Sequence, residues 1–149
     1  MLQFVSSDLF QVPADFIVHQ VNCRGVMGAG LALAIRNRVP AVYTLYKQYC
    51  STYNPSDLLG KSFIKSGVIS VFGQLDYGRD TNRVYTDYNA LKQAFTSIHN
   101  RLPLEKSIAF PFGFGCGLAN GNWYTVRQLI ELCFPGRVVY IARPKKNSN

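Results

Sequence analysis

The chain has 149 residues, of which 48% are hydrophobic and 16% charged. A chain of this length fits one domain with a substantial core, so residues 1–149 are expected to form a single domain. No apolar run approaches the ~18 residues of a membrane helix, and the segment from Met1 to Leu9 is too polar for a signal peptide, so a cytoplasmic protein without membrane partners is expected.

Positive charge predominates, with 16 Lys and Arg against 8 Asp and Glu and a formal net charge of +8. This balance favours an anionic ligand or partner. Nucleic acid stays open as a partner, although no basic stripe with interleaved aromatic residues indicates it, and the densest basic cluster, Arg143 to Lys146, is expected to be a solvated tail. The four cysteines lack the C-x-x-C spacing of a zinc site and predict neither a metal site nor a disulfide framework. They are Cys23, Cys50, Cys116 and Cys133.

The first third of the chain predicts two strands and two helices. Leu2 to Val5 is a short candidate strand, and Phe16 to Val21 is a nearly continuous apolar run, which suits a central strand covered on both faces. A helix is expected from Gly28 until Pro40 breaks it. A second helix is expected from Ala41 to Tyr53, where apolar residues recur at i, i+3, i+4 and i+7.

The middle of the chain predicts shorter elements. A turn at residues 54–57 precedes Leu58 to Ser66, which is either a loop or an edge strand. Val68 to Phe72 reads as a strand, and the polar loop from Leu75 to Asn82 either reverses the chain or borders the site. Arg83 to Thr86 is expected to be another short strand.

The last part of the chain predicts two helices and two strands. Asp87 is expected to cap a helix that ends at about Arg101. A strand from Ser107 to Phe110 and a helix through Val126 to Cys133 follow, and Val138 to Ile141 closes the sheet. This order of elements predicts a three-layer α/β/α domain.

Two glycine-rich segments each join a predicted strand to a predicted helix, Gly28-Ala29-Gly30 and Gly113 to Leu118 (G-F-G-C-G-L). A helix N-terminus has unpaired N–H groups and a positive dipole end, and glycine lets a phosphate approach the backbone. One Gly-x-Gly is weak evidence, because a tight turn explains it too and Leu33 stands where the dinucleotide-binding fingerprint needs a third glycine. Two such segments predict paired anion sites facing one hollow, which suits a diphosphate flanked by sugars.

These residues resemble the macro domains, a family that binds ADP-ribose and its derivatives. The likeness rests on Ser7-Asp8-Leu9 before an apolar strand, on the strand end Val21-Asn22, and on the two glycine segments. It implies an α/β fold with a mixed, mostly parallel central sheet over residues 1–149, and a monomer.

Within the family the chain is most similar to the small ADP-ribose 1''-phosphate phosphatase-type members, whose strand ends in H-x-x-N-x-x-G. His19, Asn22 and Gly25 match that pattern. The resemblance implies an adenine site at Asp8 and Leu9, although Ser7 replaces the family's usual glycine. It implies a site for the ribose and diphosphate at Asn22, Gly28, Ala29, Gly30, Leu31, Gly113, Phe114, Gly115, Cys116, Gly117 and Leu118.

His19 and Asn22 are the candidate catalytic residues. Asn22 would hold the distal ribose or orient a water, and His19 would act as a general acid or base or would position Asn22. A buried histidine in a strand is also commonly structural. Cys116 as a phosphocysteine nucleophile is not favoured, because the C-x5-R loop of cysteine phosphatases would need an arginine near Asn122.

Two other branches of the family use carboxylates that this chain lacks. Branches that remove acetyl or ADP-ribosyl groups often carry an aspartate in the first helix, where this chain has Ala32. The branch that cleaves glutamate-linked ADP-ribose uses a lysine and an aspartate, near which this chain has Gln74 and Ala119.

The resemblance therefore implies a protein that binds ADP-ribose or ADP-ribose 1''-phosphate and hydrolyses the latter to ADP-ribose and phosphate, with no metal or cofactor. Two alternatives stay open. One is a non-catalytic reader of ADP-ribose, and the other is a hydrolase that removes ADP-ribose from protein or nucleic acid.

Overall fold

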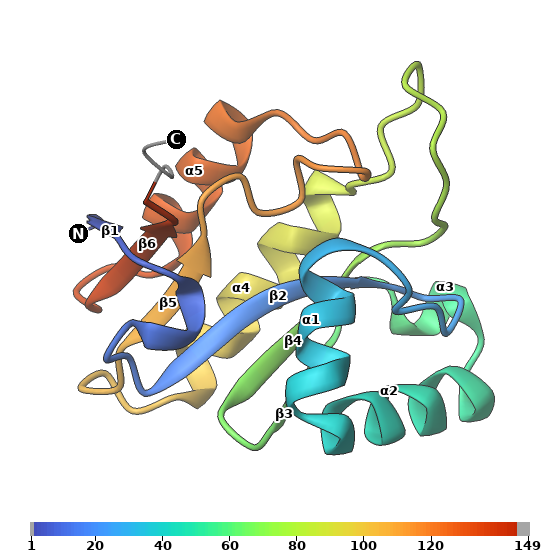
Figure 1. The fold of residues 1–149 in the computed structure, drawn as a ribbon, viewed down its shortest axis with the longest axis horizontal. Coiled ribbons are helices and arrows are strands. Elements are labelled where there is room, and N and C mark those ends of the chain that lie inside the picture. Colours follow the sequence, from blue (N-terminus) through green and yellow to red (C-terminus); the bar gives the residue numbers. More distant parts are fainter. Residues whose placement is uncertain (1, 146–149) are drawn as a thin grey trace.

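A computed structural model of the protein describes residues 2–145 and consists of a six-stranded sheet with helices on both faces (Figure 1). The strand order is β1-β6-β5-β2-β4-β3, and every neighbouring pair is parallel except β3 and β4. The predicted three-layer α/β/α fold with a mixed, mostly parallel sheet is confirmed. The strands are β1 (Leu2–Ser6), β2 (Phe16–Asn22), β3 (Ser62–Lys65), β4 (Val68–Gln74), β5 (Ile108–Pro111) and β6 (Val139–Arg143).

The helices pack on the two faces through separate apolar clusters. In Figure 1, α1 and α2 lie in front of the sheet, and α4 and α5 lie behind it. Side chains alternate along β4, so Ile69 and Val71 join the cluster under α4 and α5 while Val68 and Phe72 join the one under α1 and α2. The helices are η1 (Leu9–Gln11), α1 (Gly30–Arg38), α2 (Pro40–Thr52), α3 (Pro55–Leu58), α4 (Tyr88–Arg101) and α5 (Trp123–Cys133).

Helix α4 shows how the local sequence fixes an element. The Asp87 carboxylate accepts a hydrogen bond from the backbone N–H of Ala90 at 3.0 Å, as predicted for an N-cap. The buried residues of the helix recur at helical spacing on one face, which lies on the sheet. They are Ala90, Leu91, Ala94, Phe95 and Ile98.

Two local predictions need revision, and one open choice is settled. Residues 83–86 are not a strand, because the backbone N–H groups of Tyr85 and Thr86 both donate to the carbonyl of Ala119, and only Thr86 forms a single bridge to the sheet. The predicted turn at residues 54–57 includes the short helix α3, which Pro55 begins. The open choice between loop and edge strand after residue 58 is settled by β3, which is the antiparallel edge strand.

The predicted basic tail is partly structured. Arg143 ends β6 and is exposed, as expected for a solvated residue, and its guanidinium carbon lies 4.5 Å from the ring centre of Phe112. The rest of that cluster extends to Lys146, which lies outside the described residues. No helix within residues 2–145 is long and apolar enough to cross a membrane.

Candidate functional site

A pocket of about 720 Å³ opens where β5, β2 and β4 reach their carboxyl ends. Its walls come from residues 19–32, 74–79 and 111–119. The loops after β4 and β5, yellow-green and orange in Figure 1, lie at the same end of the molecule as the start of α1. A crevice at this edge is the usual ligand site of open α/β sheets, and the volume is typical of a site for a nucleotide-sized molecule.

Both glycine segments line this one pocket, because they follow adjacent parallel strands. β2 and β5 pair through Phe16 and Ile108, so the segments that follow these strands emerge side by side. The prediction that residues 28–30 and 113–118 share a hollow is confirmed. All of the ribose and diphosphate residues expected from the resemblance line it except Cys116.

The second glycine segment has a backbone that glycine requires. Gly113 and Gly115 have φ values of 77° and 71°, in the left-handed region. The side chain of Phe114 between them is buried, with its ring centre 5.3 Å from that of Phe110 and 5.7 Å from that of Phe95, so it fixes the loop to the core. Within residues 2–145, the N–H groups of Gly115, Gly117 and Leu118 donate no hydrogen bond and are free for an anion.

The side chain of Asn22 is occupied by the turn that follows β2. Its Oδ1 accepts from the N–H of Arg24 at 2.9 Å, and its Nδ2 donates to the carbonyl of Val26 at 2.7 Å. The hydroxyl of Tyr46 lies 2.8 Å from Oδ1 and 2.7 Å from the carbonyl oxygen of Asn22. One amide hydrogen of Asn22 is left for a ligand, and the rest of the side chain shapes the turn.

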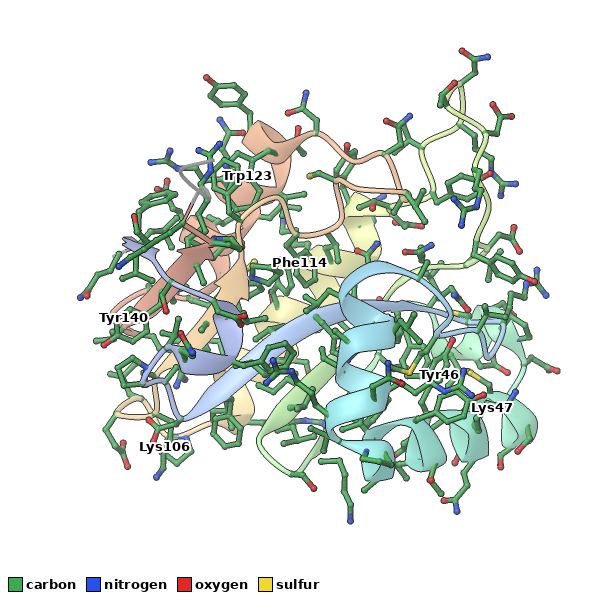
Figure 2. All side chains as sticks on the ribbon, viewed as in Figure 1. Tyr46, Lys47, Lys106, Phe114, Trp123 and Tyr140 are labelled. Carbon is green, nitrogen blue, oxygen red and sulfur yellow. The ribbon has the colours of Figure 1, made fainter. Side chains whose placement is uncertain are left out.

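Tyr46 is a site residue that the sequence identified only as core. It comes from α2, has no exposed surface, and lies beside the loop between β2 and α1 (Figure 2). Its hydroxyl also accepts from the N–H of Gly25 at 3.1 Å, where the φ of Gly25 is 84°. Burial raises the pKa of Tyr46 well above its ordinary value, so the phenol stays protonated as a donor.

His19 lies at the base of the pocket and is only 1% exposed. Its Nε2 lies 2.6 Å from the hydroxyl of Ser70 on the neighbouring strand, and its Nδ1 has no partner within the described residues. Burial lowers the pKa of His19 to about 3, so the ring is neutral at physiological pH.

Gln20 connects two walls of the pocket, and no sequence pattern identified it. Its Nε2 donates to Gln74 Oε1 at 2.8 Å and to the hydroxyl of Thr86 at 3.0 Å. The Thr86 hydroxyl donates in turn to the carbonyl of Gly115 at 2.6 Å. The second glycine segment is therefore tied through Gln20 to the end of β4. The bonds of this link join residues 29 to 66 positions apart and leave no local trace in the sequence.

The remaining predicted residues lie beside the pocket. Asp8 is exposed and caps η1, where its carboxylate accepts from the N–H of Phe10 at 2.9 Å. Leu9 is buried with Ala109 under the sheet. Neither residue lines the pocket, and the adenine site stays a prediction.

Cys116 also lies outside the lining of the pocket. Its thiol lies 3.2 Å from the carbonyl of Phe114, and burial raises its pKa to about 11. A protonated thiol is a weak nucleophile, which agrees with the low weight given to a phosphocysteine.

Ala32, Gln74 and Ala119, which stand where other branches carry catalytic groups, all line the pocket. Of the described residues that line it, none is Asp or Glu. Within residues 2–145 no cluster of His, Cys, Asp and Glu side chains is arranged to hold a metal ion.

The strand order and the paired glycine segments define a macro domain fold. Solved structures with this fold include the macrodomain of Mycobacterium tuberculosis DarG, with a TM-score of 0.77 and 24% identity over 97% of this chain and 99% of that one. The macrodomain of Thermus aquaticus DarG matches with a TM-score of 0.75 and 23% identity over 97% and 99% of the two chains. No family model matches the sequence.

Curated relatives match over shorter stretches. The ADP-ribose 1''-phosphate phosphatase of Meyerozyma guilliermondii is 35% identical over 68 residues, which are 42% of this chain and 39% of the relative. The DNA ADP-ribosyl glycohydrolase of Mycobacterium tuberculosis is 36% identical over 76 residues, which are 51% of this chain and 20% of the relative. The matches thus span two fifths or less of these relatives. The predicted resemblance to the macro domain family is confirmed.

Proposed function

We propose that residues 1–149 act as a single macro domain that binds ADP-ribose derivatives and hydrolyses ADP-ribose 1''-phosphate to ADP-ribose and phosphate. The observation that carries the proposal is the pocket of about 720 Å³ that both glycine segments line. The phosphatase name of the relative from Meyerozyma guilliermondii supports the reaction.

The diphosphate of the ligand would lie between the two glycine segments. The free N–H groups of Gly115, Gly117 and Leu118 would donate to it from one side, and residues 28–31, which lead into α1 at Gly30, would face it from the other. The net charge of +8 favours such a ligand. The adenine would extend toward Asp8, one of whose carboxylate oxygens caps η1.

In the proposed reaction, a water attacks the phosphorus and the bond between phosphorus and the ribose oxygen breaks. The backbone N–H groups would stabilise the charge that develops on the phosphoryl oxygens. We expect His19 to act as a general acid, to act as a general base, or to position Asn22. Because His19 is buried and neutral, we favour the third role, in which it positions the strand end at Asn22. The remaining amide hydrogen of Asn22 would orient the ribose or the water. With no carboxylate in the pocket lining, we expect slow turnover.

A second candidate is the removal of ADP-ribose from DNA. The glycohydrolase from Mycobacterium tuberculosis matches half of this chain, and DarG macrodomains share the fold. Gln74 and Ala119 line the pocket where the branch that cleaves glutamate-linked ADP-ribose has a lysine and an aspartate, so a release of ADP-ribose from DNA would need other residues of the pocket.

One set of assays separates these functions. Phosphate release from ADP-ribose 1''-phosphate and ADP-ribose release from a modified DNA strand and a modified protein are measured for the wild type, His19→Ala and Asn22→Ala. Asn100→Ala, on α4 away from the pocket, is the matched control. We expect phosphate release that both site variants abolish and the control retains. Binding without release would identify a reader, and ADP-ribose release without phosphate release would establish the second candidate.

The same proposal includes a monomer in the cytoplasm. The four free cysteines, two of them buried, suit a reducing compartment. Size-exclusion chromatography with light scattering tests the monomer, since a mass near 33 kDa in place of 16.7 kDa would contradict it.

A further inference from the structure

The loop after β4 contributes one wall of the pocket through Tyr77, Gly78 and Arg79. Arg79 is the only Lys, Arg, Asp or Glu among the described residues that line the pocket. Neither the predicted phosphate-binding segments nor the proposed catalytic residues include it. Arg79 is exposed, so its charge is solvated and is available to a ligand that enters the pocket.

Two of the other charges of this loop, Asp76 and Arg83, are paired with each other, whereas the carboxylate of Asp80 accepts only from the N–H of Asn82 at 2.9 Å and forms no ion pair within residues 2–145. The carboxylate of Asp76 accepts from Arg24 Nε at 2.7 Å and from Arg83 Nη2 at 2.8 Å. Hydrogen bonds from these two side chains hold the pKa of Asp76 below its ordinary value. Within residues 2–145, Arg79 forms no ion pair. Arg79 is thus the charged side chain of this loop that lines the pocket, while the carboxylates of Asp76 and Asp80 lie outside the lining.

The loop is also held in place by bonds that leave Arg79 free. The Gln74 amide donates to the carbonyl of Asp76 at 2.8 Å, and the N–H of Asp80 donates to the hydroxyl of Tyr85 at 3.3 Å. A Cβ at Gly78 would lie 2.2 Å from that hydroxyl, so the backbone packs directly on Tyr85. Arg79 is therefore carried by a segment with fixed neighbours on both sides.

The sheet order places Arg79 at one end of the pocket. The loops after β5, β2 and β4 emerge in that order, with adjacent strands about 4.8 Å apart. Phe112 at the β5 end packs on Trp123 with ring centres 4.9 Å apart and has the guanidinium of Arg143 4.5 Å from its ring centre. Asp8, toward which the adenine is proposed to extend, follows β1 on this side of the sheet. Residues 113–118 follow β5, residues 28–31 follow β2 in the middle, and Arg79 lies at the β4 end. A bound nucleotide sugar would thus direct its terminal sugar toward Arg79.

We propose that Arg79 determines specificity by binding a phosphate attached to the terminal ribose, beyond the diphosphate. This inference rests on the proposed function. The terminal ribose of ADP-ribose is uncharged, so ADP-ribose alone gives Arg79 no anionic partner, whereas an added phosphate offers the guanidinium two oxygens. That phosphate can be the monoester of ADP-ribose 1''-phosphate or a phosphodiester of a strand whose base carries ADP-ribose.

Calorimetry tests the proposal with three ligands: ADP-ribose, ADP-ribose 1''-phosphate, and a short DNA strand with ADP-ribose on one base. The proteins are the wild type, Arg79→Gln, Arg79→Lys and the control Arg101→Gln. Arg101 is exposed at the C-terminal end of α4, and the substitution Arg101→Gln removes the same charge as Arg79→Gln. The quantity compared is the ratio of the Kd for ADP-ribose to the Kd for each phosphate-bearing ligand, because this ratio cancels general effects on folding.

We expect Arg79→Gln to reduce this ratio about ten-fold or more for one phosphate-bearing ligand, as loss of a charge-assisted hydrogen bond does. Arg79→Lys should restore part of it, and Arg101→Gln should leave it within about two-fold. A loss confined to ADP-ribose 1''-phosphate identifies the monoester, and a loss confined to the strand identifies the phosphodiester.

An unchanged ratio in Arg79→Gln, or an equal change in Arg101→Gln, would overturn the role of Arg79. Wild-type protein that fails to bind ADP-ribose would instead overturn the proposed function. The two failures are therefore distinguishable in one experiment.

Discussion

Replacing Tyr46 with phenylalanine removes one oxygen atom from a fully buried position below the pocket. That oxygen donates to Asn22 and accepts from the N–H of Gly25 at 3.1 Å. Each buried hydrogen bond contributes about 1 kcal/mol net, and a buried donor left without a partner costs about 1–3 kcal/mol. We therefore expect Tyr46→Phe to lower the free energy of unfolding by about 2–3 kcal/mol.

Urea denaturation followed by circular dichroism measures this change. For a chain of this size it corresponds to a fall in Tm of roughly 5–10 °C. Tyr53→Phe is the matched control, because Tyr53 is 51% exposed and its hydroxyl forms no hydrogen bond within residues 2–145. Affinity for ADP-ribose should fall in Tyr46→Phe as well, since the turn from Asn22 to Val26 loses its support. A stability change below about 0.5 kcal/mol, or one equal to that of Tyr53→Phe, would refute this account of the turn.

Two further predictions concern the glycine loop and the buried histidine. Gly115→Ala should weaken ADP-ribose binding at least about ten-fold by calorimetry, because a Cβ at this position, where φ is 71°, would lie 3.1 Å from two side-chain oxygens. Gly136→Ala is the control, because Gly136 has a φ of 73° and lies away from the pocket. It should lose comparable stability and keep its affinity for ADP-ribose. Comparable affinity in the two variants would contradict the role of the loop. The pKa of His19 is about 3 in the folded protein, against an ordinary value of 6.5. Between these two pH values only the unfolded chain binds a proton at His19. The free energy of unfolding should therefore decline by about 1.4 kcal/mol per pH unit as the pH falls from 6.5 toward 3. His19→Asn should remove that slope in urea denaturation measured at a series of pH values. An equal slope in the wild type and in His19→Asn would show that His19 is not buried as described.

The parts of the fold that could be predicted are those with local causes. Apolar runs identified β2 and β4, Asp87 identified the start of α4, and Gly113 and Gly115 marked a loop whose backbone needs positive φ. The shared pocket followed from these elements because parallel strands place their carboxyl-end loops on one edge.

The parts that could not be predicted depend on contacts between distant residues. The spacing of Tyr46 in its helix indicates a core residue, and nothing local shows that its hydroxyl reaches Asn22, 24 positions away. Gln20 and Thr86 are linked across 66 positions. The same cause explains the wrong strand at residues 83–86. Val84, Tyr85 and Thr86 are residue types common in strands, but the N–H groups of Tyr85 and Thr86 donate to the carbonyl of Ala119.

The measurement that most directly tests the central claim is an NMR titration of the backbone amide groups with ADP-ribose. If both glycine segments hold one diphosphate, the amide resonances of residues 28–31 and 113–118 should shift together and follow a single Kd. Shifts confined to one segment, or two segments that saturate at different ligand concentrations, would contradict a shared binding site.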